Sequence, residues 1–327
     1  GEYFDLGDRL ALGHRRLSII DLSDNGRQPR VSDRDVIVFN GEFYNYQPIR
    51  DELSSRVTFT SRSDTEVLLK GIQIHGRSFI HQVRGMYSFS IWNEDRRQLL
   101  LCRDPVGVKP LYWYRKGNLF MFASELRAFH EHPCFDKTID QNSLATYLTY
   151  GYIPAPDSIY RHVKKCMPGT FMLVDEDLQI TTDQYWSASE AFESADPPQR
   201  SEEDLADELE LELLESLRLR MVADVPVGIF LSGGVDSSLV TAMLQKHSTQ
   251  QISTFTIGFE DKRFDESGQA KRVAEHVGTL HHERICTESD FVEIANRVAD
   301  VVDEPFADAS IIPTLLVSEF AKQHVKV

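Results

Sequence analysis

A short apolar run, a glycine turn and a helical pattern follow one another at 225–247, and this order constrains how the second half can fold. VPVGIFL at 225–231 is typical of a buried strand, and SSLVTAMLQKH at 237–247 has apolar residues at helical spacing. The Ser-Gly-Gly turn at 232–234 would place backbone N–H groups around an anion. No lysine follows the glycines, so the Walker pattern is absent. The stretch predicts either a phosphate loop without the usual lysine or a glycine turn without a ligand.

Strands and helices alternate through the rest of the second half. Strand patterns at 251–259 and 281–286 flank a helical pattern at 266–278, which predicts a parallel α/β sheet. A longer helical pattern at 202–221 precedes them, with leucines recurring on one face at Leu205, Leu209, Leu213 and Leu217.

The first half is instead rich in short strand patterns. A polar stretch with paired prolines at 187–202 predicts a linker, so we expect one domain at 1–186 and another at 203–327. Helical patterns, notably one at 65–76, are interleaved with the predicted strands, which lie at 9–20, 35–41, 87–93, 98–104 and 111–124.

Bulk properties exclude several classes of protein. A chain of 327 residues favours two domains. The formal net charge of −16 argues against a nucleic-acid partner. No apolar run approaches the length of a membrane span, so we expect no membrane partner. The four cysteines are scattered without C-x-x-C spacing, which favours reduced thiols and a cytoplasmic protein.

Polar side chains around the glycine turn suggest the chemistry of the second half. The hydroxyls of Ser232, Ser237 and Ser238 add hydrogen-bond donors, and a helix N-terminus adds positive potential. Asp236 is an unusual neighbour for a phosphate unless a cation lies between them. A Mg²⁺ ion held by this carboxylate and by phosphates would explain its position.

SGGVDSS, together with blocks such as ADVPVG, FTIGFED, LGTLHHE and DEPFADASIIPT, resembles the pyrophosphate loop and flanking segments of AMP-forming ATP pyrophosphatases. Glutamine-hydrolysing asparagine synthetases share this fold. The resemblance implies that the loop grips the pyrophosphate that leaves ATP, a task for which no Walker lysine is required. It implies that backbone groups of Leu231 and Ile257 bind adenine and that Asp236 helps to hold Mg²⁺. The implied ATP-binding residues are Leu231, Ser232, Gly233, Gly234, Asp236, Ser237, Ser238 and Ile257.

The sequence gives less specific predictions for other polar residues of the second half. Glu304 and Asp308 either support the ATP site or are solvated loop carboxylates. His281 and His282 are adjacent, so they should point apart on a strand and have structural roles.

DVIVFNGEFYNY contains Asn40-Gly41 after a strand pattern. Asn-Gly is a strong hairpin signal, so a plain turn is one interpretation. However, GHRRLSIIDLS, SRSDTEVLL, RGMYSFSIWN, RDPVGVKPLYW and ASELRAF surround it in order. This array resembles the glutaminase domain of class II glutamine amidotransferases. Together the halves resemble the asparagine synthetase family, which implies an α+β N-terminal-nucleophile hydrolase sandwich followed by an α/β parallel-sheet ATP pyrophosphatase domain.

The resemblance also implies a glutamine site that makes chemical sense. Arg16 would clamp the α-carboxylate as a bidentate fork, and Glu42 and Asp64 would neutralise the α-ammonium. Asn40 and the Gly41 N–H would form an oxyanion hole. Arg15 is a weaker candidate than Arg16, and His14 is expected to pack. The backbone that lines the pocket would come from Leu17, Ser18, Ile19 and Ile20.

The sequence departs from the family at its nucleophile. The class uses an N-terminal cysteine, but no cysteine precedes Cys102, which ends a buried-looking strand. Because the chain starts in mid-flow at Gly1 and stops at Val327 after the strand-like HVKV, we expect both ends to be cut, with the cysteine before and a second phosphate block beyond. We therefore expect this chain by itself not to hydrolyse glutamine. Within the body, Pro105 and Phe43 replace the family's usual arginine and isoleucine.

The leading hypothesis is an ATP-dependent, glutamine-hydrolysing asparagine synthetase that uses glutamine, ATP, Mg²⁺ and a carboxylate, with aspartate as the default acceptor. A homodimer is one option for its assembly. Two rivals are kept. One amidates another carboxylate, on a surface-polysaccharide sugar or in the closure of a β-lactam-type ring. The other is a non-catalytic, glutaminase-like binding protein.

Overall fold

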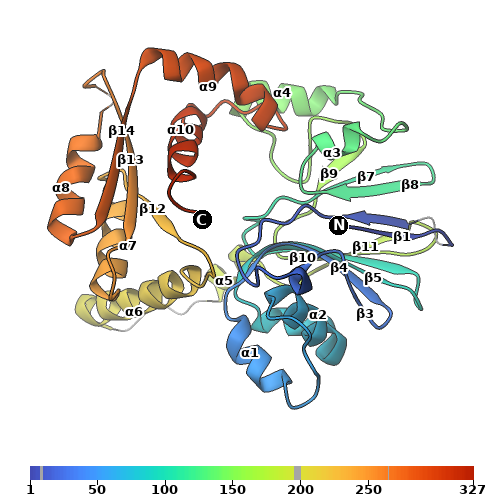
Figure 1. Ribbon diagram of the computed structural model, residues 1–327. Helices are drawn as coiled ribbons and strands as arrows, with labels where there is room; N and C mark the ends of the chain where they lie inside the picture. The colour runs from blue at the N-terminus through green and yellow to red at the C-terminus, as the bar shows by residue number, and fades with distance from the viewer. Residues whose placement is uncertain (8–9, 195–199, 264) are drawn as a thin grey trace. The chain divides into compact units, whose positions relative to one another are not determined.

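The chain forms two compact units, seen in a computed structural model that describes residues 1–7, 10–194, 200–263 and 265–327 (Figure 1). Unit 1 comprises Gly1–Pro197 and Asp303–Ala307, and unit 2 comprises Pro198–Val302 and Asp308–Val327. The predicted linker at 187–202 includes residues 195–199, which lie outside the described residues, as do residues 8–9 at the start of the first predicted strand.

A six-stranded antiparallel sheet with the order β11-β10-β6-β5-β4-β3 forms the centre of unit 1. Side chains alternate along its strands: Ile37 and Phe39 belong to one buried cluster, whereas Val36 and Val38 belong to another. Both faces of the sheet are therefore covered. The strands are β3 Arg30–Ser32, β4 Asp35–Phe43, β5 Gly85–Asn93, β6 Gln98–Arg103, β10 Thr170–Val174 and β11 Ile180–Gln184.

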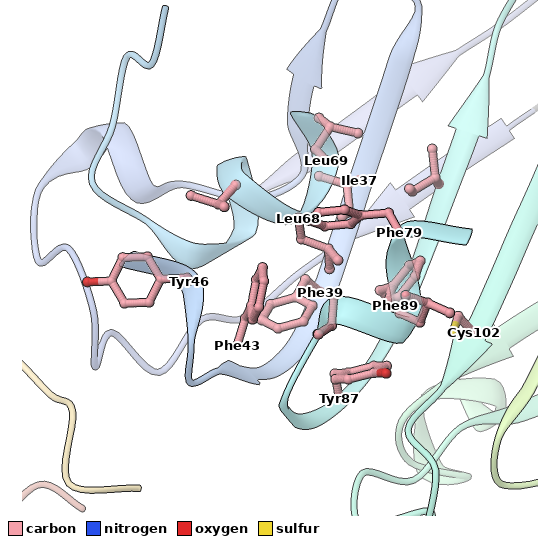
Figure 2. Close-up of a cluster of buried hydrophobic side chains, with 14 of the residues drawn as sticks. Ile37, Phe39, Phe43, Tyr46, Leu68, Leu69, Phe79, Tyr87, Phe89 and Cys102 are labelled. Atoms are coloured by element: carbon pink, nitrogen blue, oxygen red, sulfur yellow. The ribbon is translucent and has the colours of Figure 1, made fainter. Parts of the chain in front are cut away.

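Helices α1 (Tyr46–Leu53) and α2 (Asp64–His75) cover one face of this sheet (Figure 1). Figure 2 shows Leu68 and Leu69 of α2 among Phe39, Phe43 and Phe89 in their shared cluster. The opposite face packs on a second β layer, through Leu12, Trp113 and Phe122 among others. Unit 1 also contains β1 Glu2–Asp5, β2 Leu10–Gly13, β7 Tyr112–Lys116, β8 Leu119–Ala123, β9 Val163–Lys165, α3 Arg127–His130, α4 Gln141–Tyr150, α5 Ala188–Glu193, and the 3-10 helices η1 Asp24–Gly26 and η2 Gly76–Gln82.

Unit 2 contains a parallel sheet of β12 (Gly228–Phe230), β13 (Ser253–Phe259) and β14 (Leu280–Cys286), in that order. The parallel α/β sheet predicted for the second half is thus confirmed. No described helix is both long and apolar enough to cross a membrane. The helices of unit 2 are α6 Glu202–Arg220, α7 Val235–Lys246, α8 Ser267–Val277, α9 Glu288–Val301 and α10 Ile311–Ala321.

Two predicted strands are wrong in part. Of the strand predicted at 9–20, only β2 forms. The Arg16 guanidinium donates hydrogen bonds to the carbonyl groups of Ile20 and Asp21, which folds this segment back on itself. The terminal HVKV is not assigned to a strand, although Val327 pairs with the chain at the start of β12: its N–H donates to the Pro226 carbonyl at 3.2 Å, and its carbonyl accepts from the Gly228 N–H at 2.8 Å.

The leucine face predicted for α6 is only partly buried. Leu205, Leu213 and Leu217 are half-buried and Leu209 is 58% exposed, whereas Leu214 is the leucine of this helix that is fully buried.

Candidate functional site

Three consecutive residues of β4, Asn40, Gly41 and Glu42, form the first part of the candidate site. They pair with Ser88, Tyr87 and Met86 of β5. The plain-turn interpretation of Asn-Gly is therefore wrong, because the dipeptide lies within a continuous nine-residue strand. The Asn40 Nδ2 donates to the Ser124 hydroxyl at 2.9 Å. This bond fixes the amide of the residue predicted for the oxyanion hole.

Gly41 is required by the close approach of the neighbouring strand. A Cβ atom at this position would lie 2.1 Å from the carbonyl oxygen of Met86 and 2.6 Å from the Cα of Tyr87. No other residue could occupy the position without moving β5.

Two buried carboxylates follow this strand segment. Asp64 is the first residue of α2, and its Oδ2 accepts a hydrogen bond from the Phe43 N–H at 3.0 Å. Glu42 is buried, and within the described part of the chain its Oε1 has no hydrogen-bond partner. Burial raises the pKa of both carboxyl groups, and the negative charge of Asp64 further raises the pKa of Glu42. A cation that entered here would relieve both the repulsion and the missing hydrogen bond.

Arg16 supplies positive charge near this pair. It is half-buried, whereas Arg15 is exposed, as expected if Arg16 is the functional arginine. Its Nη1 donates to the Asp21 carbonyl at 2.9 Å and to Ser18 Oγ at 3.3 Å. Its charge lowers the pKa of Asp64 against the larger, opposing effect of burial. Arg16 therefore both shapes its loop and acts electrostatically on Asp64.

The other residues predicted to lie at the pocket differ in how deeply they are buried. The Ile20 carbonyl binds Arg16, and Ile20 itself is buried in the core with Ile19 packed beside it. Leu17 is 60% exposed. His14 is held in the fold, since burial lowers its pKa and its side chain hydrogen-bonds the Phe39 backbone.

Three residues near the site carry no role in the sequence analysis. Ser124 binds Asn40, and the buried Asp104 carboxylate accepts backbone N–H bonds from Tyr87, Val108 and Lys109. The positive charge of Lys109 lowers the pKa of Glu42 against the larger effect of burial. The only sequence signal for them is their position inside the blocks RDPVGVKPLYW and ASELRAF.

Cys102 does not provide a nucleophile for this site. It is buried in β6, as its sequence context predicts, and burial raises the pKa of its thiol well above its usual value. A thiol in this state stays protonated and unreactive.

The second candidate site is the loop between β12 and α7. The Ser232 and Ser237 hydroxyls lie 2.9 Å apart, and Ser237 Oγ also accepts from the Ser232 N–H at 3.2 Å. Gly233 has φ +79°, and a Cβ atom there would lie 2.7 Å from the Ala270 backbone nitrogen. Gly234 caps α7 without a side-chain hydrogen bond. The first N–H groups of the helix are thus left for a ligand.

The remaining predicted ATP residues surround this loop. Leu231 is buried, and its N–H donates to the Phe255 carbonyl at 2.9 Å. Ile257 is half-buried on β13, and Ser238 Oγ is buried without a hydrogen-bond partner among the described residues. Asp236 is exposed in the first turn of α7.

A magnesium ion at Asp236 would depend on ligands from outside the protein. Among the described residues, no cluster of three or more His, Cys, Asp or Glu side chains could hold a metal ion. A single exposed carboxylate fits a Mg²⁺ ion that takes its other ligands from phosphates and water.

Glu304 and Asp308 lie in different environments. The Glu304 carboxylate accepts from the Ile159 N–H at 2.9 Å and pairs with Lys165 at 2.6 Å, all within unit 1. The Asp308 carboxylate caps its own turn by accepting the Ser310 N–H, and this bond lowers its pKa.

His281 and His282 make separate structural contacts on β14. The Nδ1 of His281 lies 3.0 Å from the Thr254 hydroxyl, and the His282 ring stacks on Phe255 with 4.9 Å between centroids.

In unit 1 the structure brings together Gly41 of β4, the neighbouring Asn40 amide and the buried carboxylates of Glu42 and Asp64. The family model described as "Glutamine amidotransferase domain" matches residues 2–186, and the model described as "Asparagine synthase" matches residues 208–327. The chain belongs to the family that joins these two domains, the glutamine-hydrolysing asparagine synthetases.

Curated relatives agree with this assignment. The chain is 36% identical over 323 residues to asparagine synthetase [glutamine-hydrolyzing] 1 of Bacillus subtilis, covering 98% of this chain and 50% of the relative. It is 34% identical over 338 residues to a putative asparagine synthetase of Methanocaldococcus jannaschii, covering 97% of this chain and 64% of that one. The chain thus spans about half to two thirds of the length of these relatives.

Among solved structures, one match is the glutamine phosphoribosylpyrophosphate amidotransferase of B. subtilis complexed with ADP and GMP. The TM-score is 0.36 at 17% identity, over 78% of this chain and 48% of that one.

Proposed function

We propose that the protein containing this chain is an ATP-dependent amidotransferase that hydrolyses glutamine and makes asparagine from aspartate. The observation that carries the proposal is the pair of buried carboxylates, Glu42 and Asp64, beside the Asn40-Gly41 strand and the Arg16 charge. This arrangement has a group for each part of glutamine. Family membership and the named relatives support it.

In the first domain, proposed as residues 1–186, glutamine binds by complementary charge. Arg16 receives the α-carboxylate, and Glu42 and Asp64 receive the α-ammonium. The Asn40 amide and the Gly41 N–H stabilise the negative oxygen that develops when the side-chain amide is attacked. The loop from Leu17 to Ile20 lines the pocket. The attacking group in this class is an N-terminal cysteine, and the buried Cys102 of β6 does not substitute for it.

In the second domain, proposed as residues 203–327, ATP activates the acceptor carboxylate. Backbone groups of Leu231 and Ile257 hold adenine, and the loop from Ser232 to Ser238 holds the leaving pyrophosphate at the N-terminus of α7. Asp236 would hold a Mg²⁺ ion, which neutralises phosphate charge when bound. Ammonia released in the first domain then aminates the activated carboxylate, away from competing water. We place this chemistry in the cytoplasm.

There are two alternatives to this proposal. In the first, the enzyme amidates another carboxylate, of a polysaccharide sugar or a β-lactam precursor. In the second, the protein is a binding protein without catalytic activity. The exposed single carboxylate of Asp236 and the uncapped α7 favour a working nucleotide site over the binding protein.

The nucleotide products test the proposal. The full-length protein is incubated with ATP, Mg²⁺, glutamine and aspartate, and the nucleotides are separated by chromatography. We expect AMP and pyrophosphate. ADP with inorganic phosphate as the main products would contradict the loop assignment, and no ATP consumption with any carboxylate would favour the binding protein.

A further inference from the structure

Strand β4 loses its neighbour β3 just before the candidate glutamine site. β3 pairs Arg30 with Ile37, so two positions further along this register Gln28 would face Phe39. β3 itself begins only at Arg30, and the Gln28 side chain supplies the missing acceptor instead. Its Oε1 accepts the Phe39 N–H at 2.6 Å. Because Gln28 is buried, this hydrogen bond is shielded from water.

The Gly41 N–H points to this same edge of β4. Tyr87, which lies opposite Gly41 in β5, uses its own N–H and carbonyl for Asp104, at 3.2 and 2.8 Å. Gly41 and Tyr87 therefore form a pair that exchanges no hydrogen bonds, and the Gly41 N–H faces away from β5. Because N–H groups alternate along a strand, those of Phe39, Gly41 and Phe43 all point one way.

Gln28 also reaches the acidic side of the site. Its Nε2 donates to Thr65 Oγ1 at 3.3 Å, and the Thr65 N–H donates to Asp64 Oδ1 at 2.8 Å. The other oxygen of Asp64 accepts the Phe43 N–H at 3.0 Å. The Gly41 N–H is thus flanked by two bound N–H groups, and one buried side chain, Gln28, joins β4 to the first turn of α2.

We propose that Gln28 is a positioning residue for the glutaminase reaction, which holds the edge of β4 so that the Gly41 N–H is directed at the substrate oxygen and keeps Asp64 aligned with that strand. This inference rests on the proposed function, which assigns Gly41 to the oxyanion hole and Asp64 to the α-ammonium. Gln28 acts through the Phe39 backbone and through Thr65, not on the substrate itself.

Removal of the Gln28 amide should disturb the chemistry more than the fold. A buried N–H without an acceptor is costly, so the Phe39 backbone should move toward another partner. Gly41 is two residues away on the same edge and should move with it. A small displacement of a group at the reacting centre is enough to slow a reaction strongly.

Glutaminase assays of the full-length protein test the two contacts of Gln28 separately. Gln28→Met keeps the length of the side chain but removes both hydrogen bonds, so it should lower kcat by about 10- to 100-fold and raise the KM for glutamine. Gln28→Asn keeps an amide that is one methylene too short, and it should lower kcat as well even if Gln28→Met fails to fold. Thr65→Val removes only the hydroxyl that Gln28 binds, so it should raise KM while kcat changes little.

Gln73→Met is the matched control. The Gln73 Nε2 donates to the Ser32 carbonyl at 3.0 Å and to Asp35 Oδ2 at 2.9 Å. This glutamine therefore also ties α2 to the sheet, but near the end of the helix that is remote from Asp64. Its loss should lower the temperature of thermal unfolding, as the loss of Gln28 does, and should leave kcat and KM at their wild-type values.

The outcomes separate this inference from the proposed function. If the wild type hydrolyses glutamine and the folded Gln28 variants keep its kcat, the role of Gln28 is wrong and the proposed function stands. The same conclusion follows if Gln73→Met lowers kcat as much as Gln28→Met, because lost stability then explains both. An unchanged KM in Thr65→Val would contradict the link to Asp64. If the wild type neither binds nor hydrolyses glutamine, the proposed function fails and this inference fails with it.

Discussion

At the scale of single residues, the site depends on three neighbours in β4 that meet different demands. Asn40 needs a fixed amide, which the Ser124 hydroxyl provides. Gly41 needs the absence of a side chain, because β5 approaches too closely for one. Glu42 is buried with an Oε1 that has no hydrogen-bond partner among the described residues, and the proposed function assigns this carboxylate to the ligand. Each property comes from residues distant in sequence.

Gly41→Ala should destabilise unit 1. The new Cβ would lie 2.1 Å from the Met86 carbonyl oxygen, and the strain should lower the free energy of unfolding by about 3 kcal/mol. Urea denaturation measures this change. Gly13→Ala is the control, because a Cβ there meets no atom within 4 Å. Equal stability of Gly41→Ala and wild type would show that β4 and β5 are not so closely paired.

The sequence predicts the candidate site residues but not the residues that support them. Asn40, Gly41 and Glu42 were assigned by resemblance, while local propensity alone allowed a hairpin turn at the same dipeptide. The turn was excluded only by the pairing with β5, which is a long-range contact. Ser124 has no predicted role, because its hydrogen bond with Asn40 joins segments that are distant in sequence.

At the scale of elements, helix α2 positions Asp64 through its first turn. Ser63 is the N-cap residue, and its hydroxyl accepts the Glu66 N–H at 3.3 Å. Asp64 follows it directly and binds the Phe43 N–H. The start of the helix is therefore coupled to the end of β4.

Ser63→Ala should lower the free energy of unfolding by about 1 kcal/mol, because the helix loses its N-cap hydrogen bond. The substitution should also raise the KM for glutamine, because Asp64 would be held less firmly. Thr287→Ala removes the N-cap of α9 in unit 2 and should cost a similar stability without changing this KM. Thermal unfolding and glutaminase assays check both. A KM that responds equally to the two variants would contradict the role of α2.

The loop before α7 gives a second prediction at this scale. Gly233→Ala should abolish ATP binding, since Gly233 has φ +79° and its Cβ would lie 2.7 Å from the Ala270 nitrogen. Gly268→Ala, in α8 with no atom within 4 Å of its Cβ, should bind ATP normally and gain up to about 1 kcal/mol of stability. Calorimetric titration with ATP and Mg²⁺ measures the ATP affinity of both variants. ATP binding by Gly233→Ala would place the nucleotide elsewhere.

The elements that follow a clear local pattern are predicted in both halves, including β4, β5 and β6 in the first. The alternating pattern predicted β13, β14 and α8, because parallel strands and amphipathic helices follow local periodicity. The strand predicted at 9–20 was wrong after Gly13, because a side chain, Arg16, takes the carbonyl groups that a sheet would have used. Local pattern carries no information about such competition.

At the scale of the whole molecule, the chain has two compact units, and we assign one reaction to each. Asp236→Ala should therefore abolish ATP-dependent synthesis while leaving glutaminase activity largely intact in the full-length protein. Asp236 is exposed, so stability should not change. Asp207→Ala, an exposed change on α6, should affect neither activity. Equal loss of both activities in Asp236→Ala would argue against separate sites.

The central claim is that nitrogen from glutamine reaches a carboxylate activated by ATP. The most direct measurement supplies the full-length protein with glutamine labelled with ¹⁵N in its side-chain amide, together with aspartate, ATP and Mg²⁺, and follows the label by NMR. The account predicts ¹⁵N in the side-chain amide of asparagine, with one AMP formed for each asparagine. Label that appears only as free ammonium, with no amide product and no AMP, would contradict it.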